Sequence, residues 1–138
     1  MTQLTEHFTL EELTRTDTGL PNEPDPTSRA NLSRIANALE AVRAVCGGRA
    51  VHVSSGFRSE AVNARVGGSS TSAHRFGLAA DFTIFGQPIA DTFRLLRRSG
   101  IVFDQLILEP SWIHIGLSEG YSRQQALIKV ASGYEVAP

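Results

Sequence analysis

The stretch "TSAHRFGLAADF", residues 71–82, places a histidine and an aspartate seven positions apart in an otherwise largely apolar, glycine-containing run. Asp81 stands between the apolar residues "LAA" and "FTIF", so residues 78–85 are predicted to form a buried strand. An unpaired carboxylate in such a strand is costly, and Asp81 therefore needs a partner. Either His74 and Asp81 are unrelated residues at the two ends of this run, or they are two ligands of one metal ion.

Two further strands are predicted downstream, in "VFDQLILE" at residues 102–109 and "WIHIGL" at residues 112–117. The turn between them is short enough for the strands to be antiparallel neighbours. Strand alternation then places His114 on the same face as Trp112, opposite the aliphatic side chains. Glu109 ends the first of the two strands, so the hairpin can bring its carboxylate near His114.

Helices are predicted on both sides of these strands. The strongest follows Asp25, a capping residue, and has apolar residues at helical spacing as far as Cys46. A shorter helix is expected to begin after Thr9, which has a glutamate three positions later, as in a capping box. Two more are predicted over residues 60–66 and 89–99.

The remaining strand signals complete a small sheet. A short strand is predicted from residue 51 to the turn at Ser55, and alternation turns its His52 away from the two valines that flank it. The tail, residues 122–136, is predicted to add an edge strand. The pattern predicts an α+β fold in which helices pack on a small, largely antiparallel sheet. A length of 138 residues suits one domain, residues 1–138.

Charge and composition exclude several classes of partner. A net charge of −1 and a pI near 6.4 argue against nucleic acid and against an anionic membrane surface. No apolar run is long enough to span a bilayer, and we expect no signal peptide because the first residues lack a basic segment followed by an apolar one. Cys46 is the only cysteine, so an intramolecular disulfide is impossible. We expect a monomer.

Two imidazoles and one carboxylate are the usual protein ligands of a catalytic zinc ion, and His74, Asp81 and His114 offer that set. A nearby carboxylate that is not a ligand can accept a proton from the attacking water, and Glu109 is the available candidate. Arg58, in the turn "SGFRS", can neutralise a substrate carboxylate or a developing oxyanion.

Each of these residues also has a structural interpretation. His74 can be a solvated or capping residue of a loop, and Asp81 can pair with Arg58 or Arg75. Glu109 can cap the hairpin turn, and Arg58 can be a surface charge. Ligands scattered over about 40 residues are a weak signal by spacing alone, so the residue pattern leaves these alternatives open.

A resemblance adds to this pattern. The string "SAHRFGLAAD", residues 72–81, matches at every fixed position the S-x-H-x-x-G-x-A-x-D signature of the M15 family of zinc D-Ala-D-Ala carboxypeptidases and L-Ala-D-Glu endopeptidases. The segments "FTLEEL", "VSSGFRS", "FDQLILE" and "WIHIGL" occur in the order found in the short M15 domains of phage lysis and tail genes. The resemblance covers nearly the whole chain and implies the Hedgehog/DD-peptidase fold.

The resemblance also implies roles for individual residues. His74, Asp81 and His114 would be the ligands of one Zn²⁺ ion. Ser72 and Arg58 match the family's serine and arginine positions, which contact the substrate or stabilise the transition state.

The sequence departs from the family pattern at one position. Better-known members place the catalytic carboxylate three residues before the last histidine ligand, where this chain has Ser111. A serine is a poor proton acceptor, and the short phage-like branch often carries a glutamate at the position of Glu109, which is therefore the expected base. Trp112 lies beside the expected site, where it either lines a substrate groove or fills core volume.

The expected function is that of a zinc-dependent carboxypeptidase or endopeptidase that cleaves the peptide stems of peptidoglycan, as a phage endolysin or a tail-associated enzyme. Such a protein reaches the wall by holin-type release from the host cytoplasm or as part of a virion. Ser111 keeps open a second hypothesis, a zinc-containing but catalytically weak or inactive wall-binding module. A peptidase acting on substrates outside the cell wall is a third.

Overall fold

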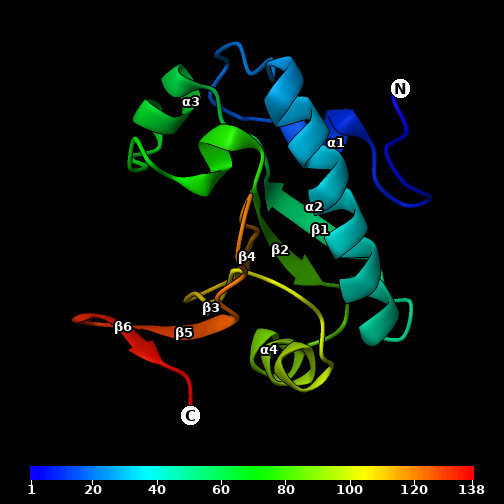
Figure 1. Cartoon of the computed structure of the whole chain (residues 1–138), viewed down its shortest axis with the longest axis vertical. Coiled ribbons are helices and arrows are strands. Elements are labelled where there is room, and N and C mark those ends of the chain that lie inside the picture. Colours follow the sequence, from blue (N-terminus) through cyan, green and yellow to red (C-terminus); the bar gives the residue numbers. More distant parts are fainter.

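A six-stranded sheet forms the centre of the molecule (Figure 1), as seen in a computed structural model that describes residues 1–138. The strands are β1 (Val51–Ser55), β2 (Ala79–Ile84), β3 (Gln105–Leu108), β4 (Ile113–Gly116), β5 (Gln125–Val130) and β6 (Gly133–Val136). They lie in the order β1-β2-β4-β3-β5-β6, and every pair of neighbours is antiparallel except β3 and β5. The predicted α+β fold with a largely antiparallel sheet is confirmed.

The structure contains four α-helices and one 3₁₀ helix, and three of the α-helices begin after a residue whose side chain caps them. They are α1 (Leu10–Thr14), α2 (Pro26–Val45), α3 (Glu60–Arg65), the 3₁₀ helix η1 (Ala73–Phe76) and α4 (Ile89–Arg98). The Asp25 carboxylate accepts a hydrogen bond of 2.7 Å from the backbone N–H of Ser28 and so caps α2. The Thr9 hydroxyl caps α1 by accepting from the backbone N–H of Glu12 at 3.1 Å. The segment around His74, expected to be a loop, is the short helix η1.

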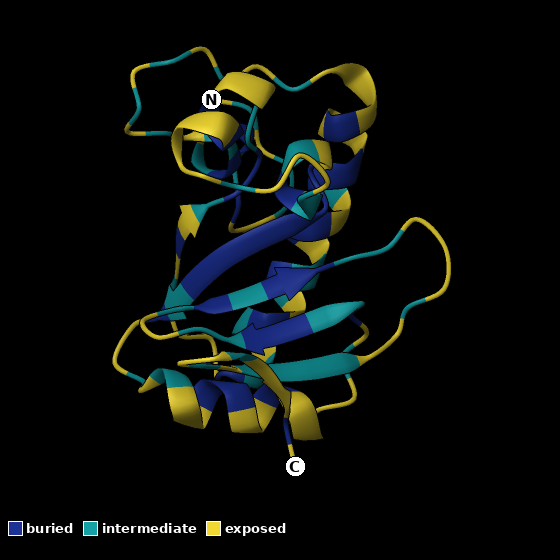
Figure 2. Cartoon of the chain, turned by 90° about the vertical axis from the view of Figure 1, so that its left-hand side faces the viewer, coloured by how far each residue is buried: buried dark blue, intermediate teal, exposed yellow.

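One face of the sheet is covered, because α1, α2 and α4 pack there and enclose a core of 21 buried residues. Ile113 and Ile115 of β4 are fully buried in this core, and Cys46 joins it, as expected of a core thiol. Figure 2 looks at the molecule from the side of the opposite face, where β3 and β4 contain both buried and intermediate residues, whereas β5 and β6 contain only intermediate and exposed ones. None of the helices is both long and apolar enough to cross a membrane.

The C-terminal tail forms a hairpin of two strands, β5 and β6, instead of the single edge strand predicted. β5 pairs in parallel with β3, with Ile107 opposite Leu127, and β6 then pairs antiparallel with β5. Alternation within the tail cannot predict this, because the parallel pairing depends on a strand about twenty residues away. The hairpin extends the sheet beyond β3 (Figure 1).

The proline-rich segment before α2 has no helix or strand, and Asn22 holds it in place. The Asn22 side-chain amide donates to the carbonyl oxygens of Thr14 at 2.7 Å and of Phe57 at 2.9 Å. Its Oδ1 accepts from the backbone N–H of Ser59 at 2.6 Å. These three bonds fix both sides of Arg58, one of the expected site residues.

Candidate metal centre

Three side chains from separate elements converge on one point. His74 comes from η1, Asp81 from β2 and His114 from β4, and Asp81 and His114 are register partners across the β2–β4 pair. Asp81 Oδ1 lies 3.3 Å from His74 Nε2 and 2.9 Å from His114 Nδ1. Ligand atoms of a tetrahedral zinc site are roughly 3.3 Å apart. These residues therefore fit one small cation bound by two imidazole nitrogens and one carboxylate oxygen.

The His74 ring is held in the orientation that metal binding requires. Its Nδ1 lies 2.7 Å from the carbonyl oxygen of Gly56, to which the ring N–H donates, and this leaves Nε2 free to face Asp81. A hydrogen bond of this kind fixes the tautomer of a ligating histidine and increases its basicity. The side chain is 4% exposed, so the interpretation of His74 as a solvated loop residue does not hold.

Gly77 allows η1 to pack closely against α2. It has a φ of 71° at the end of η1, and a Cβ there would lie 2.4 Å from the carbonyl oxygen of Ser28 in α2. Glycine is needed because η1 turns in the left-handed region while touching α2. The small residue thus serves the packing of η1, which carries His74.

Arg58 approaches the second oxygen of Asp81. Its Nη2 lies 3.5 Å from Asp81 Oδ2, and its Nε donates to Ser55 Oγ at 3.1 Å. The Arg58 side chain is 18% exposed, so it is not a free surface charge. Asp81 therefore contacts both imidazoles through one oxygen and an arginine through the other. Arg75, the other arginine considered for Asp81, instead donates to the Arg58 carbonyl oxygen at 3.4 Å.

The charged groups of this cluster perturb each other's protonation. Burial alone would raise the pKa of Asp81, but the hydrogen bond from His114 and the nearby His74 ring hold it well below the usual value of an aspartate. Burial lowers the pKa of Arg58, and the Asp81 charge opposes that change. Arginine titrates far above neutral pH, so the Arg58–Asp81 contact joins two charged groups at pH 7.

A cavity of about 620 Å³ lies over the three residues, and the open face of β3, β4 and β5 forms its floor. His114, Ile107 and Leu127 lie side by side across those strands in the middle of this floor. Arg58 and Ser72 line the cavity as well, and Ser72 Oγ also accepts from the His74 backbone N–H at 3.3 Å. The structure thus brings the expected substrate-binding residues to the same cavity as the three candidate metal ligands.

Glu109 lies in this cavity too. Its backbone N–H donates to the Trp112 carbonyl oxygen at 3.0 Å and closes the β3–β4 turn, while its side chain lines the cavity. Burial raises the pKa of Glu109, with the charge of Asp81 adding to the effect and that of His114 opposing it. A carboxylate with a raised pKa is suited to accept a proton near neutral pH.

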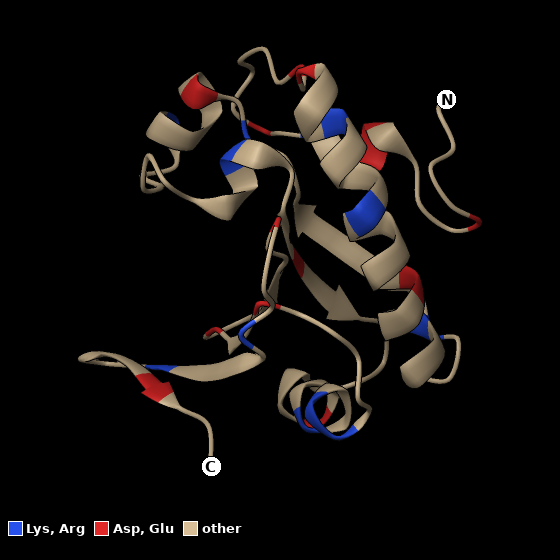
Figure 3. Cartoon of the chain, in the orientation of Figure 1, with Lys and Arg blue, Asp and Glu red and all other residues tan.

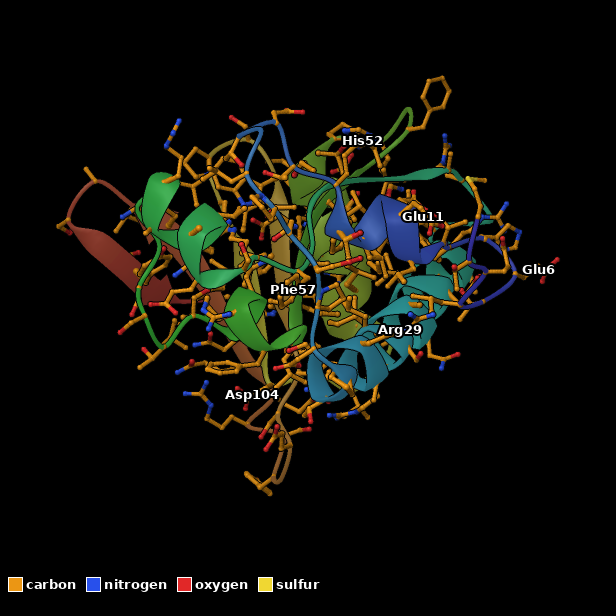
Figure 4. All side chains as sticks on the ribbon, turned by 90° about the horizontal axis from the view of Figure 1, so that it is seen from above. Glu6, Glu11, Arg29, His52, Phe57 and Asp104 are labelled. Atoms are coloured by element: carbon orange, nitrogen blue, oxygen red, sulfur yellow. The ribbon has the colours of Figure 1, made fainter.

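The other expected residues divide between the cavity and the surface. Trp112 lines the cavity and is only partly buried, which favours a groove residue over one that fills the core. Ser111 is exposed and is not among the residues that line the cavity. His52 is exposed, as alternation predicts, and Figure 4 shows it far from Asp104, a residue at one end of the cavity.

Three residues that line the cavity were not predicted from the sequence. Asp104 and Arg123 line one end, and Tyr134 of β6 lines the side beyond Glu109. Tyr134 stands in the tail, where it could be found only by knowing that β5 pairs with β3 and brings β6 alongside. No local pattern marks Arg123.

Comparison with known proteins identifies the family. A family model described as Peptidase M15 matches residues 6–116, which include all three converging residues. The chain belongs to the M15 peptidase family. The resemblance inferred from residues 72–81 is confirmed.

This member of the M15 family is also similar to a curated protein, the zinc D-Ala-D-Ala carboxypeptidase of Streptomyces albus G. The two are 36% identical over 74 residues, which is 54% of this chain and 29% of the relative. The chain thus spans less than a third of that relative's length. Strands β5 and β6, with the loop that precedes them, lie beyond the segment that the family model matches.

Proposed function

We propose that this chain is a zinc-dependent peptidase that cleaves the peptide stems of bacterial peptidoglycan, with residues 1–138 acting as a single catalytic domain. One Zn²⁺ ion would be held by His74 Nε2, His114 Nδ1 and an oxygen of Asp81. The observation that carries the proposal is the convergence of these three groups in a cavity that also contains the partly buried carboxylate of Glu109. Membership of the M15 family and similarity to a zinc D-Ala-D-Ala carboxypeptidase support the metal and the substrate class.

The residues around the metal have distinct tasks in this proposal. Zinc, when bound, polarises a substrate carbonyl and makes a coordinated water more acidic. Glu109 accepts the proton of the attacking water and delivers it to the nitrogen of the departing amine. Arg58 donates hydrogen bonds to the substrate oxygen on which negative charge develops, and its own charge is fixed in place by Asp81 and Ser55. Ser72 and Trp112 line the groove that holds the peptide.

Glu109 is the better candidate for the base than the family position occupied by Ser111. Both residues belong to the turn between β3 and β4, but the Ser111 side chain is exposed to solvent outside the cavity. Glu109 lies within it and has a raised pKa, as a proton acceptor at neutral pH requires.

The test is cleavage of purified muropeptides by zinc-loaded protein and by protein stripped of metal with a chelator. Zinc-dependent release of a D-alanine or of a peptide fragment is expected, and mass analysis of the products tells a terminal from an internal cut. Full cleavage after rigorous zinc removal would contradict the metal mechanism. D-containing and all-L peptides, tested in parallel, separate a wall enzyme from a peptidase acting on other substrates.

A second candidate is a zinc-containing wall-binding module with weak or no turnover, and it is favoured by the serine, Ser111, that stands at the position of the catalytic carboxylate of better-known family members. Wild type and a Glu109→Gln variant distinguish the two, because only an enzyme loses turnover when its base is replaced while zinc content is kept. As a wall enzyme of phage type, the protein would reach its substrate by holin-type release or within a virion.

A further inference from the structure

An ion pair stands at one end of the cavity, away from the metal ligands. Arg123 donates from Nε to Asp104 Oδ1 at 2.9 Å and from Nη2 to Oδ2 at 2.7 Å. The backbone N–H of Arg123 also donates to Asp104 Oδ1, at 3.1 Å. Asp104 is 16% exposed and Arg123 53%, and both line the cavity. The carboxylate therefore holds the guanidinium in one orientation and leaves its Nη1 edge open.

The backbone directly after Arg123 is strained. The next residue, Gln124, has a φ of 50° and is the single non-glycine residue with a positive φ. Its side chain holds this conformation by donating to the Ile101 carbonyl oxygen at 3.0 Å and accepting from the Phe103 N–H. Left-handed non-glycine residues persist only where their surroundings enforce them, and they concentrate at functional sites. Here the enforced turn fixes the position of Arg123.

The sheet register gives the distance between Arg123 and the metal centre. Ile107 is the partner of His114, and Gln105, two residues earlier on β3, is the partner of Gly116. Two strand residues span about 6.6 Å, and Asp104 comes directly before Gln105. Asp104 is therefore three residues, or about 10 Å, from Ile107 along β3, and a peptide bound in extended form along this floor would reach the Arg123 guanidinium roughly three residues from the bond at the metal.

We propose that Arg123, held by Asp104, is a specificity-determining residue that binds a carboxylate of the substrate peptide about three residues from the scissile bond. This inference rests on the proposed function and names the chemistry of one part of its substrate. The guanidinium geometry suits a carboxylate, and hydrogen bonds between two charged groups are stronger than those between neutral ones. Asp104 already accepts hydrogen bonds from Nε and Nη2 of the guanidinium, so the substrate carboxylate would bind at the open Nη1 edge.

The test compares a stem peptide with versions in which one carboxylate at a time is converted to a carboxamide. For wild type, amidation at one position is expected to lower kcat/KM by about tenfold, the value of one charge-assisted hydrogen bond. In Arg123→Met the same amidation should change kcat/KM by less than about twofold, because the donor is gone. An equal discrimination in wild type and Arg123→Met would overturn the proposal.

Two controls keep the result interpretable. Arg98 is an exposed arginine on α4 (arginines and lysines are blue in Figure 3) and does not line the cavity, so Arg98→Met removes the same charge but should keep the discrimination. Arg123→Met leaves Asp104 without its partner, so the double variant Asp104→Asn/Arg123→Met is measured as well. It should lose the discrimination in the same way.

A binding measurement tests this inference separately from the proposed function. The same peptides are titrated calorimetrically into zinc-loaded Glu109→Gln protein, with and without Arg123→Met. Arg123-dependent preference for one carboxylate supports the inference even if wild type cuts none of the peptides. Cleavage by wild type without any such preference overturns the inference and leaves the proposed function standing. Absence of both binding and cleavage contradicts both.

Discussion

The Nδ1 atom of His74 lies 2.7 Å from the carbonyl oxygen of Gly56, and this contact couples the metal centre to the turn after β1. The same turn is in close contact with α1, because the Phe57 N–H donates to the Leu13 carbonyl oxygen at 2.8 Å. One short segment therefore connects the N-terminal helix to the orientation of a proposed zinc ligand.

Gly56→Ala should disturb both ends of this connection. A Cβ at Gly56 would lie 2.3 Å from the Leu13 carbonyl oxygen, so the backbone must shift. We expect the free energy of unfolding to fall by about 1–3 kcal/mol, as for overpacking in a core. Zinc affinity should fall roughly 10- to 100-fold, the usual effect of losing the partner of a ligating histidine. Thermal unfolding and zinc titration measure the two effects.

Gly120→Ala is the matched control, because nothing lies within 4 Å of a Cβ at that position. It should leave stability and zinc affinity unchanged. Normal zinc affinity in Gly56→Ala would refute the proposed role of the Gly56 carbonyl.

Zinc should stabilise the folded chain through Asp81 and the two imidazoles. At a free zinc concentration 100 times Kd, linkage predicts a gain of about 2.7 kcal/mol in the free energy of unfolding. Asp81→Asn removes the charged ligand and should abolish most of this gain, whereas Glu109→Gln should retain it. Thermal unfolding with and without zinc provides the measurement, and equal stabilisation of Asp81→Asn and wild type would exclude the triad as the binding site.

Replacing Glu109 by Gln should remove the proton acceptor and keep the metal. We expect kcat to fall by about 100- to 10,000-fold, with KM and zinc content near those of wild type. Ser111→Ala is the control from the same turn, and its rate should stay within about twofold of wild type because that side chain is outside the cavity. A large loss in Ser111→Ala with little in Glu109→Gln would reverse the assignment of the base.

The Asp104–Arg123 pair should make stability depend on pH. Hydrogen bonds from Arg123 lower the pKa of Asp104 in the folded chain, against a smaller opposing effect of burial. The pair therefore stabilises the fold above the unfolded pKa of aspartate, about 3.9, and this contribution is lost as the pH falls through the lower folded value. Asp104→Asn should cost up to about 1 kcal/mol at pH 7, because the pair is partly exposed to solvent.

Urea unfolding at pH 7 and near pH 3 measures the difference in the free energy of unfolding between wild type and Asp104→Asn. It should shrink at the lower pH as Asp104 becomes protonated. Asp91→Asn breaks the exposed Asp91–Arg94 pair on α4 and should have the smaller effect at pH 7. A difference between wild type and Asp104→Asn that grows toward low pH would contradict the proposed role of the pair.

Much of the site was predictable because its signals are local. The spacing from His74 to Asp81 matches a signature, and strand alternation placed His114 on the face opposite the buried isoleucines. Other features depended on contacts between distant segments. Whether Asp81 paired with an arginine or with the imidazoles could not be read from the sequence, and in the structure it contacts both.

The sequence by itself determined helices α1 to α4, four of the strands and, through the family signature, the three candidate metal ligands. Capping side chains such as Asp25, helical and alternating periodicity and a short signature are all written within a few neighbouring residues. The tertiary structure alone decided that β5 lies parallel to β3, that Glu109 and Tyr134 share a cavity, and that Arg123 meets Asp104. These depend on the register between segments far apart in the chain, which is set by packing over the whole sheet.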